Sequence, residues 1–118
     1  MYFVDRAVAV IKPKQPFLDW LNRLPDTDMI DLSLDSLRSD CTAILLPEFI
    51  EPEEGVAHID EISEQLFKME LASWDEDEAL WPKDLSLKAF WEWFDVEIHS
   101  TVIDSVDSDI TNSPASEL

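Results

Sequence analysis

The apolar residues near the N-terminus form a continuous run rather than an alternation of apolar and polar positions. Every residue of Ala7–Ile11 is apolar, within a stretch that predicts a strand over residues 3–12. A run of this kind indicates burial on both faces or pairing with a partner strand. Pro13 ends it. A second apolar run, Cys41–Leu46, stops at Pro47 and predicts a second strand.

Helical spacing begins directly after the first strand. A short amphipathic helix is predicted between Pro16 and Pro25, because apolar residues recur there at intervals of three and four. These residues are Phe17, Trp20, Leu21 and Leu24. Residues 26–30 are expected to form a polar connection, and Ser33 is placed to cap a helical turn that runs through Arg38.

Two long helices are predicted in the second half of the chain. The first runs from about Glu53 to Trp74, and the second starts at Asp84 or Ser86. The apolar stripe of the second helix fits a period of 3.6 residues as far as Val102. Its members are Leu87, Phe90, Trp91, Phe94, Ile98 and Val102.

The order of these elements predicts an α+β fold, in which a small sheet is covered by two long C-terminal helices and one short helix. The helix between the two strands permits a right-handed parallel crossover. Two strands alone are marginal in water, so either further strands exist or the sheet is completed across a dimer. We expect a homodimer that associates through the strand over residues 3–12 or through the exposed part of the aromatic helices. Residues 1–107 are expected to form one domain, followed by a flexible polar tail over 108–118.

Composition supports a folded chain. Of 118 residues, 46% are apolar, including five Trp and six Phe, which excludes a disordered acidic tail. The single cysteine, Cys41, excludes an internal disulfide and a zinc site built on several thiolates. No run approaches the ~18 apolar residues of a membrane span, and the N-terminus lacks the basic region of a signal peptide. We therefore expect a reduced, soluble, cytoplasmic protein.

Charge narrows the class of partner. Eight basic side chains stand against 27 acidic ones, for a net charge of −19, and residues 51–118 alone hold three basic and nineteen acidic side chains. Direct binding to nucleic acid is excluded, because phosphate neutralisation needs Lys and Arg on one face. Anionic membranes are disfavoured for the same reason. Basic proteins and metal cations remain as partners.

No catalytic residue or cofactor is predicted. The only glycine is Gly55, so the glycine-rich loops that cradle phosphates cannot form. Cys41 with His58 or His99 as its base is the one nucleophilic arrangement available. However, Cys41 opens an apolar strand, where a free thiol behaves as a small buried hydrophobic group.

The most distinctive local feature is a run of four acids with tryptophans beside it. Acids at the C-terminal end of a helix oppose its macrodipole, so they are not placed there for helix stability. Aromatic anchors beside acids suit a basic protein surface, since Trp dominates binding hot spots. The predicted partner-binding residues are Trp74, Asp75, Glu76, Asp77, Glu78, Trp81 and Trp93. The alternative is that these acids end the helix and keep the protein soluble.

A second grouping suggests a metal site. Carboxylates and imidazoles at helical spacing on facing helices are how bundle metal centres are built, and oxygen-rich sets suit Mg²⁺, Ca²⁺ or Mn²⁺. The candidates are Glu54, His58 and Glu61 on the first long helix, and Glu92, Asp95 and His99 on the second. With so many acids, the same spacings also arise on solvated helix faces.

Two segments carry a family resemblance. AVAVIKPKQPFLDWLN (7–22) and ALWP…FWEWFDVEIHS (79–82 and 90–100) resemble small acidic bacterial proteins of uncharacterised families. The resemblance implies a bacterial cytosolic origin and no activity. The leading hypothesis is a non-enzymatic interaction module that binds a basic partner. The alternatives are a nucleic-acid mimic that inhibits a DNA- or RNA-binding protein, and a divalent-metal-binding protein or enzyme.

Overall fold

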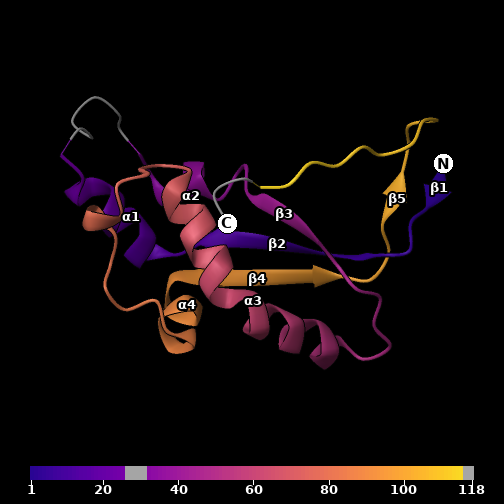
Figure 1. The fold of residues 1–118 in the computed structure, drawn as a ribbon, viewed down its shortest axis with the longest axis horizontal. Helices are drawn as coiled ribbons and strands as arrows, with labels where there is room; N and C mark the ends of the chain where they lie inside the picture. Colours follow the sequence, from indigo (N-terminus) through magenta and orange to yellow (C-terminus); the bar gives the residue numbers. More distant parts are fainter. Residues whose placement is uncertain (26–31, 116–118) are drawn as a thin grey trace.

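The apolar run of residues 7–11 lies in β2 (Ala7–Pro13), the central strand of a three-stranded sheet (Figure 1). The computed structural model describes residues 1–25 and 32–115. β3 (Thr42–Leu46) pairs with one edge of β2, and β4 (Phe94–His99) pairs with the other. Both pairings are antiparallel, so the parallel crossover is wrong. The run has its partner strands within the same chain.

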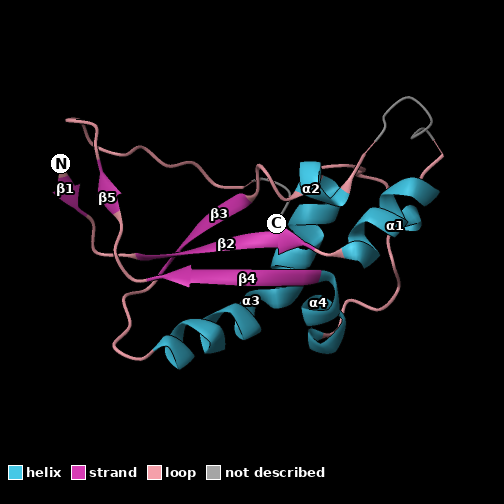
Figure 2. Ribbon diagram, turned by 180° about the vertical axis from the view of Figure 1, so that it is seen from behind, coloured by secondary structure: helices cyan, strands magenta, loops and turns pink. Residues whose placement is uncertain are grey.

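One face of this sheet is covered by helices. α3 (Pro52–Ala72), close to the predicted helix, crosses in front of β2 in Figure 1, and the strands lie in front of α3 in the reverse view of Figure 2. Alternate residues of β2 are buried beneath the helices, from Ala7 to Ile11, while the two valines between them are half-buried on the other side. That other side is the open face of the sheet. Alternation and register place on it Val8, Val10, Lys12, Ala43, Leu45, Asp95, Glu97 and His99.

The second long C-terminal helix is a wrong prediction. α4 (Leu87–Trp93) starts after Ser86, whose hydroxyl caps it as expected, but it ends at Trp93 and the chain enters β4 without a loop. Phe94 and Ile98 fit a helical stripe, yet with Val96 they also alternate as a strand does. Backbone pairing with β2 decides between the two patterns, because β2 would otherwise keep an unpaired edge. The third strand is therefore supplied by the chain itself, and completion across a dimer is not needed.

The shorter elements follow the sequence closely. α1 (Gln15–Arg23) has Pro16 in its first turn, where proline is tolerated, and α2 (Leu34–Leu37) begins at a capping box made by Ser33. The polar connection predicted over residues 26–30 lies outside the described residues.

A small ribbon stands at one end of the molecule (Figure 1). It consists of β1 (Tyr2–Phe3) paired antiparallel with β5 (Ile103–Asp104). The Tyr2 hydroxyl donates to an Asp107 carboxylate oxygen 2.7 Å away. The strand predicted over residues 3–12 is therefore two separate strands, β1 and β2. Phe3, which lies in the ribbon, is 82% exposed. Residues 105–115 contain no helix or strand.

The core is built on aromatic rings between α1, α3 and the α4–β4 junction. Phe94 is 1% exposed, and its ring centroid lies 5.4 Å from Phe17, 5.4 Å from Phe67 and 5.2 Å from Phe90. Edge-to-face and tilted ring contacts of this kind add stability to a core beyond the stability that comes from burying apolar surface. These rings connect α1, α3 and α4 to the start of β4.

Candidate partner-binding site

The four acids 75–78, here called the acidic loop, follow α3 and lead into a short 3-10 helix, η1 (Glu78–Leu80). An Asp75 carboxylate oxygen accepts from the Asp77 backbone N–H at 2.9 Å. An Asp77 carboxylate oxygen accepts in turn from the Ala79 backbone N–H at 3.0 Å and caps η1. Two of the acids therefore stabilise the local backbone of the loop and η1, a role that the sequence did not reveal. Glu76 and Glu78 are exposed.

Two indole rings hold the acidic loop from the inside. The Trp81 indole N–H donates to the Asp75 carbonyl at 2.7 Å, and the Trp20 indole N–H donates to the Leu80 carbonyl at 2.9 Å. Trp20 is itself 3% exposed, so the second bond fixes the loop to the core. The acidic loop is consequently held in place at both of its ends.

Of the three tryptophans predicted as surface anchors, two are half-buried and one is exposed. Trp93 is half-buried, and its ring centroid lies 5.2 Å from Phe67 and 6.1 Å from Phe17, so it belongs to the aromatic core. Trp81 is half-buried with its N–H already bonded. Trp74, at the end of α3, is 43% exposed. The aromatic surface available beside the acidic loop is therefore that of Trp74.

The acidic loop carries uncompensated charge. Within residues 1–25 and 32–115, every ion pair lies elsewhere, and none involves Asp75, Glu76, Asp77 or Glu78. The last turn of α3 contains no basic residue. The carbonyl end of a helix carries partial negative charge of its own. Dipole and carboxylates therefore add to one negative potential at this end of α3.

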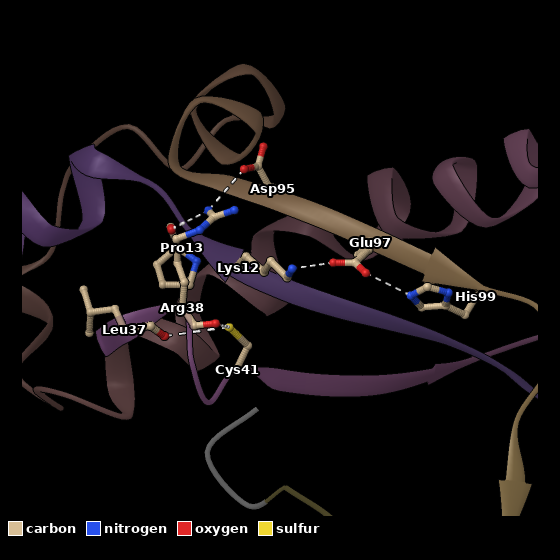
Figure 3. A network of polar contacts seen from close by, with 8 residues as sticks. All are labelled: Lys12, Pro13, Leu37, Arg38, Cys41, Asp95, Glu97 and His99. Atoms are coloured by element: carbon tan, nitrogen blue, oxygen red, sulfur yellow. Dashed lines mark hydrogen bonds and ion pairs between the residues drawn. The ribbon is translucent and has the colours of Figure 1, made fainter. Parts of the chain in front are cut away.

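Cys41 is positioned as an inert thiol. Its Sγ donates to the carbonyls of Arg38 at 3.4 Å and Leu37 at 3.7 Å, as Figure 3 shows. Burial is the largest influence on the thiol and raises its pKa, against the lowering effect of the nearby Lys12 and Arg38 charges. A thiol with a raised pKa is a weak nucleophile near neutral pH. Cys41 is half-buried just before β3, so the structure supports low reactivity of the thiol but not a fully buried hydrophobic group.

The residues of the first predicted metal set have other contacts. A Glu54 carboxylate oxygen accepts from the backbone N–H groups of Ile50 at 2.7 Å and Glu51 at 3.1 Å, and so caps α3. His58 is half-buried and lines shallow hollows beside β3, and Glu61 is exposed. Glu54 therefore closes the start of a helix instead of facing a metal.

The second metal set is divided between a helix and a strand, which corrects the single helix face on which it was predicted. Asp95 and His99 are on β4, and Glu92 lies on α4 at 4.0 Å from Lys88. On the open face of the sheet, Arg38 bonds Asp95 at 3.1 Å, while Glu97 lies between Lys12 and His99 (Figure 3). Across the described parts of the chain, no group of three or more His, Cys, Asp or Glu could hold a metal ion.

The open-face network was missed from the sequence. Hydrogen bonds from Lys12 and His99, in that order of importance, hold the pKa of the Glu97 carboxyl below its ordinary value. The signal that could have revealed this network is the alternation of charged residues along 95–99, which the helical interpretation concealed.

The comparisons with known proteins return no relative: the chain matches no family model, no curated protein and no solved structure. The resemblance to small acidic bacterial proteins stays a prediction. Among the helices of residues 1–25 and 32–115, none is long and apolar enough to span a bilayer.

Proposed function

We propose that this chain is a non-enzymatic interaction module that binds the basic surface of another protein through the acidic loop and Trp74. The observation that carries the proposal is that hydrogen bonds order the acidic loop, while none of the ion pairs within residues 1–25 and 32–115 includes it. Ordered carboxylates require little further loss of conformational freedom on binding. Their long-range attraction also accelerates the encounter with a positively charged partner.

A cytoplasmic location and a homodimeric state belong to the same proposal. A single cysteine without a disulfide partner supports the first. The exposed apolar side chains of the β1–β5 ribbon, Phe3 at 82% and Ile103 at 50%, support the second, because an isolated two-stranded ribbon is marginal in water. Light scattering that shows only a monomer at high micromolar concentration would remove the dimer from the proposal.

The experiment compares capture of basic proteins from native lysate by the wild-type chain and by an amide variant. The variant combines Asp75→Asn, Glu76→Gln, Asp77→Asn and Glu78→Gln. Amide oxygens at 75 and 77 still accept the hydrogen bonds that order the acidic loop, so the variant removes charge and keeps the local backbone. Lysine at these two positions would remove both acceptors together with the charge.

A matched control removes four acidic charges at exposed positions outside the acidic loop: Glu48→Gln, Glu53→Gln, Glu61→Gln and Asp109→Asn. Captured partners should be lost from the amide variant, retained by the control, and released as salt is raised from 0.1 M to 1 M, where the Debye length falls from about 10 Å to about 3 Å. Equal capture by wild type and amide variant would contradict the proposal.

The nucleic-acid mimic predicts one further result. If a captured protein binds duplex DNA, and that DNA competes with this chain for the same surface, the acids substitute for phosphates. Capture of basic proteins that DNA does not displace favours the interaction module.

A further inference from the structure

A small cavity lies beside the acidic loop, between the C-terminal end of α3 and the start of β3. Its volume is about 140 Å³. Apolar side chains of the core form its inner wall, and polar or aromatic side chains form the rest: Asp40, Cys41, Thr42, Glu70, Ser73 and Trp74. A cavity of about 150 Å³ holds one benzene-sized molecule, so the space here suits the end of one side chain.

Glu70 is the charged group that this cavity partly buries. Burial raises the pKa of its carboxyl, and the hydrogen bond with the Thr42 hydroxyl opposes that effect without overcoming it. No ion pair of the described residues includes Glu70. A carboxylate drawn from water without a cationic partner is stabilised by any cation that reaches it.

Besides Glu70, the one charged residue within the described chain that lines the cavity is Asp40, just before β3. The thiol of the neighbouring Cys41 stays neutral near neutral pH, because burial raises its pKa. Lys12 and Arg38 are close enough to lower the pKa of Cys41, but their ion pairs are with Glu97 and Asp95 of β4. Among the described residues, neither cation forms an ion pair with Glu70 or Asp40.

Two further features favour a cation over a neutral guest. The last turn of α3 has no basic residue, so no cationic side chain of that turn offsets the partial negative charge at its carbonyl end. Trp74 lines the same cavity and is 43% exposed, so its ring can face a bound cation. The apolar inner wall, which includes Phe17 and Leu37, suits an aliphatic stem.

We propose that this cavity receives one lysine side chain of the basic partner, with its ammonium group beside Glu70 and its stem against the apolar wall. The inference rests on the proposed function for the identity of the partner. Lysine fits better than arginine, because the Thr42 hydroxyl already bonds the Glu70 carboxylate; a compact ammonium needs only one free carboxylate oxygen, whereas a guanidinium fork takes both.

The test uses a defined probe, Nα-acetyl-lysine methylamide, and Cys41 as reporter. Cys41 lines the cavity, so an occupant should shield it from iodoacetamide. We expect saturable protection by this probe and none by the same compound acetylated at its side-chain amine, which is neutral. No protection by the charged probe would overturn the proposal, and equal protection by the arginine analogue would overturn the choice of lysine.

Glu70→Gln provides the matched variant, because the amide keeps an acceptor for Thr42 while it removes the charge. We expect protection of Cys41 to require at least about tenfold more probe in this variant, and no change in the exposed control Glu61→Gln. An unchanged dependence in Glu70→Gln, with the fold verified by circular dichroism, would overturn the role of the carboxylate.

The two proposals fail separately. If the amide variant of the acidic loop loses the partner and Glu70→Gln binds it as wild type does, the cavity proposal fails and the proposed function stands. If the lysine probe protects Cys41 but no basic protein is captured, the proposed function fails and the cavity remains a lysine site.

Discussion

The indole N–H of Trp20 donates to the backbone carbonyl of Leu80 at 2.9 Å, across 60 positions of the chain. This bond ties α1 to the segment after the acidic loop. Trp20 is 3% exposed whereas Leu80 is 36% exposed, so the bond connects an exposed segment to the core.

Trp20→Phe should loosen the acidic loop. The phenyl ring keeps most of the packing but cannot donate to Leu80, and we expect a loss of about 1–3 kcal/mol of stability. Amide hydrogen exchange over residues 75–81 should accelerate more than exchange in β2. Trp91→Phe is the control, since it removes the 2.8 Å bond to Asp60 and leaves the acidic loop untouched. Similar exchange of the loop in both variants would show that Trp20 does not fix it.

Glu70→Gln should stabilise the empty protein in a pH-dependent way. The folded pKa of Glu70 is raised above 4.5, so the folded state holds the proton more tightly and stability falls as pH rises from about 4.5 through the folded pKa. The variant lacks this loss. Its melting temperature should exceed that of wild type near about pH 7 and equal it below about pH 4. A wild type that is the more stable protein at neutral pH would contradict the burial argument.

Lys12→Met should raise the pKa of Glu97. Lys12 makes the largest contribution that lowers this pKa, followed by His99. Because the folded pKa is depressed, the stabilisation from Glu97 is present above about 4.5 and is lost as pH falls through the folded value. A titration of the Glu97 side chain by nuclear magnetic resonance measures the change. Lys14→Met, which removes a bond to the Trp91 carbonyl, should leave that titration unaltered.

Cys41 should be alkylated slowly in the native protein. Burial raises the pKa of its thiol, so the reactive thiolate is scarce near neutral pH, and the sulfur is bonded to two carbonyls. Iodoacetamide labelling followed by mass spectrometry should be slower for the folded chain than for the chain unfolded in urea at the same pH. Equal rates would mean that the thiol is freely accessible.

Phe94→Ala should lower the free energy of unfolding by about 3–5 kcal/mol, because it leaves a cavity where α4, β4 and the aromatic core meet. Phe94 is 1% exposed and contacts rings from α1, α3 and α4. Urea denaturation measures the loss. Phe94→Leu, which keeps most of the volume, should cost less, and equal costs for the two variants would argue against ring packing as the cause.

Part of the candidate site could be predicted from the sequence. The end of α3 and the acids 75–78 were found because charge and helical spacing are local properties. The structural roles of Asp75 and Asp77 could not be predicted, since they depend on which backbone N–H groups the folded loop brings near their carboxylates. Trp93 was misplaced for a similar reason: only the packing of Phe17 and Phe67 shows that its side of α4 faces other rings.

The cavity beside Glu70 could not be predicted from the sequence. Thr42 and Glu70 lie on different elements, and their contact requires the end of α3 to be held over the start of β3. The aromatic core that holds it there combines residues from α1, α3 and β4. Such a site depends on distances between elements, and spacing along one element does not contain them.

The sequence by itself determined the α+β class, the bounds of α1, α3 and β3 to within a few residues, and the concentration of negative charge after α3. These properties follow from hydrophobic spacing, proline and charge, which act over a few residues. Tertiary structure alone decided that residues 94–99 are a strand. Phe94, Val96 and Ile98 satisfy part of a helical stripe and the whole of an alternation, and the free backbone edge of β2 chooses the strand, because its N–H and C=O groups need partners.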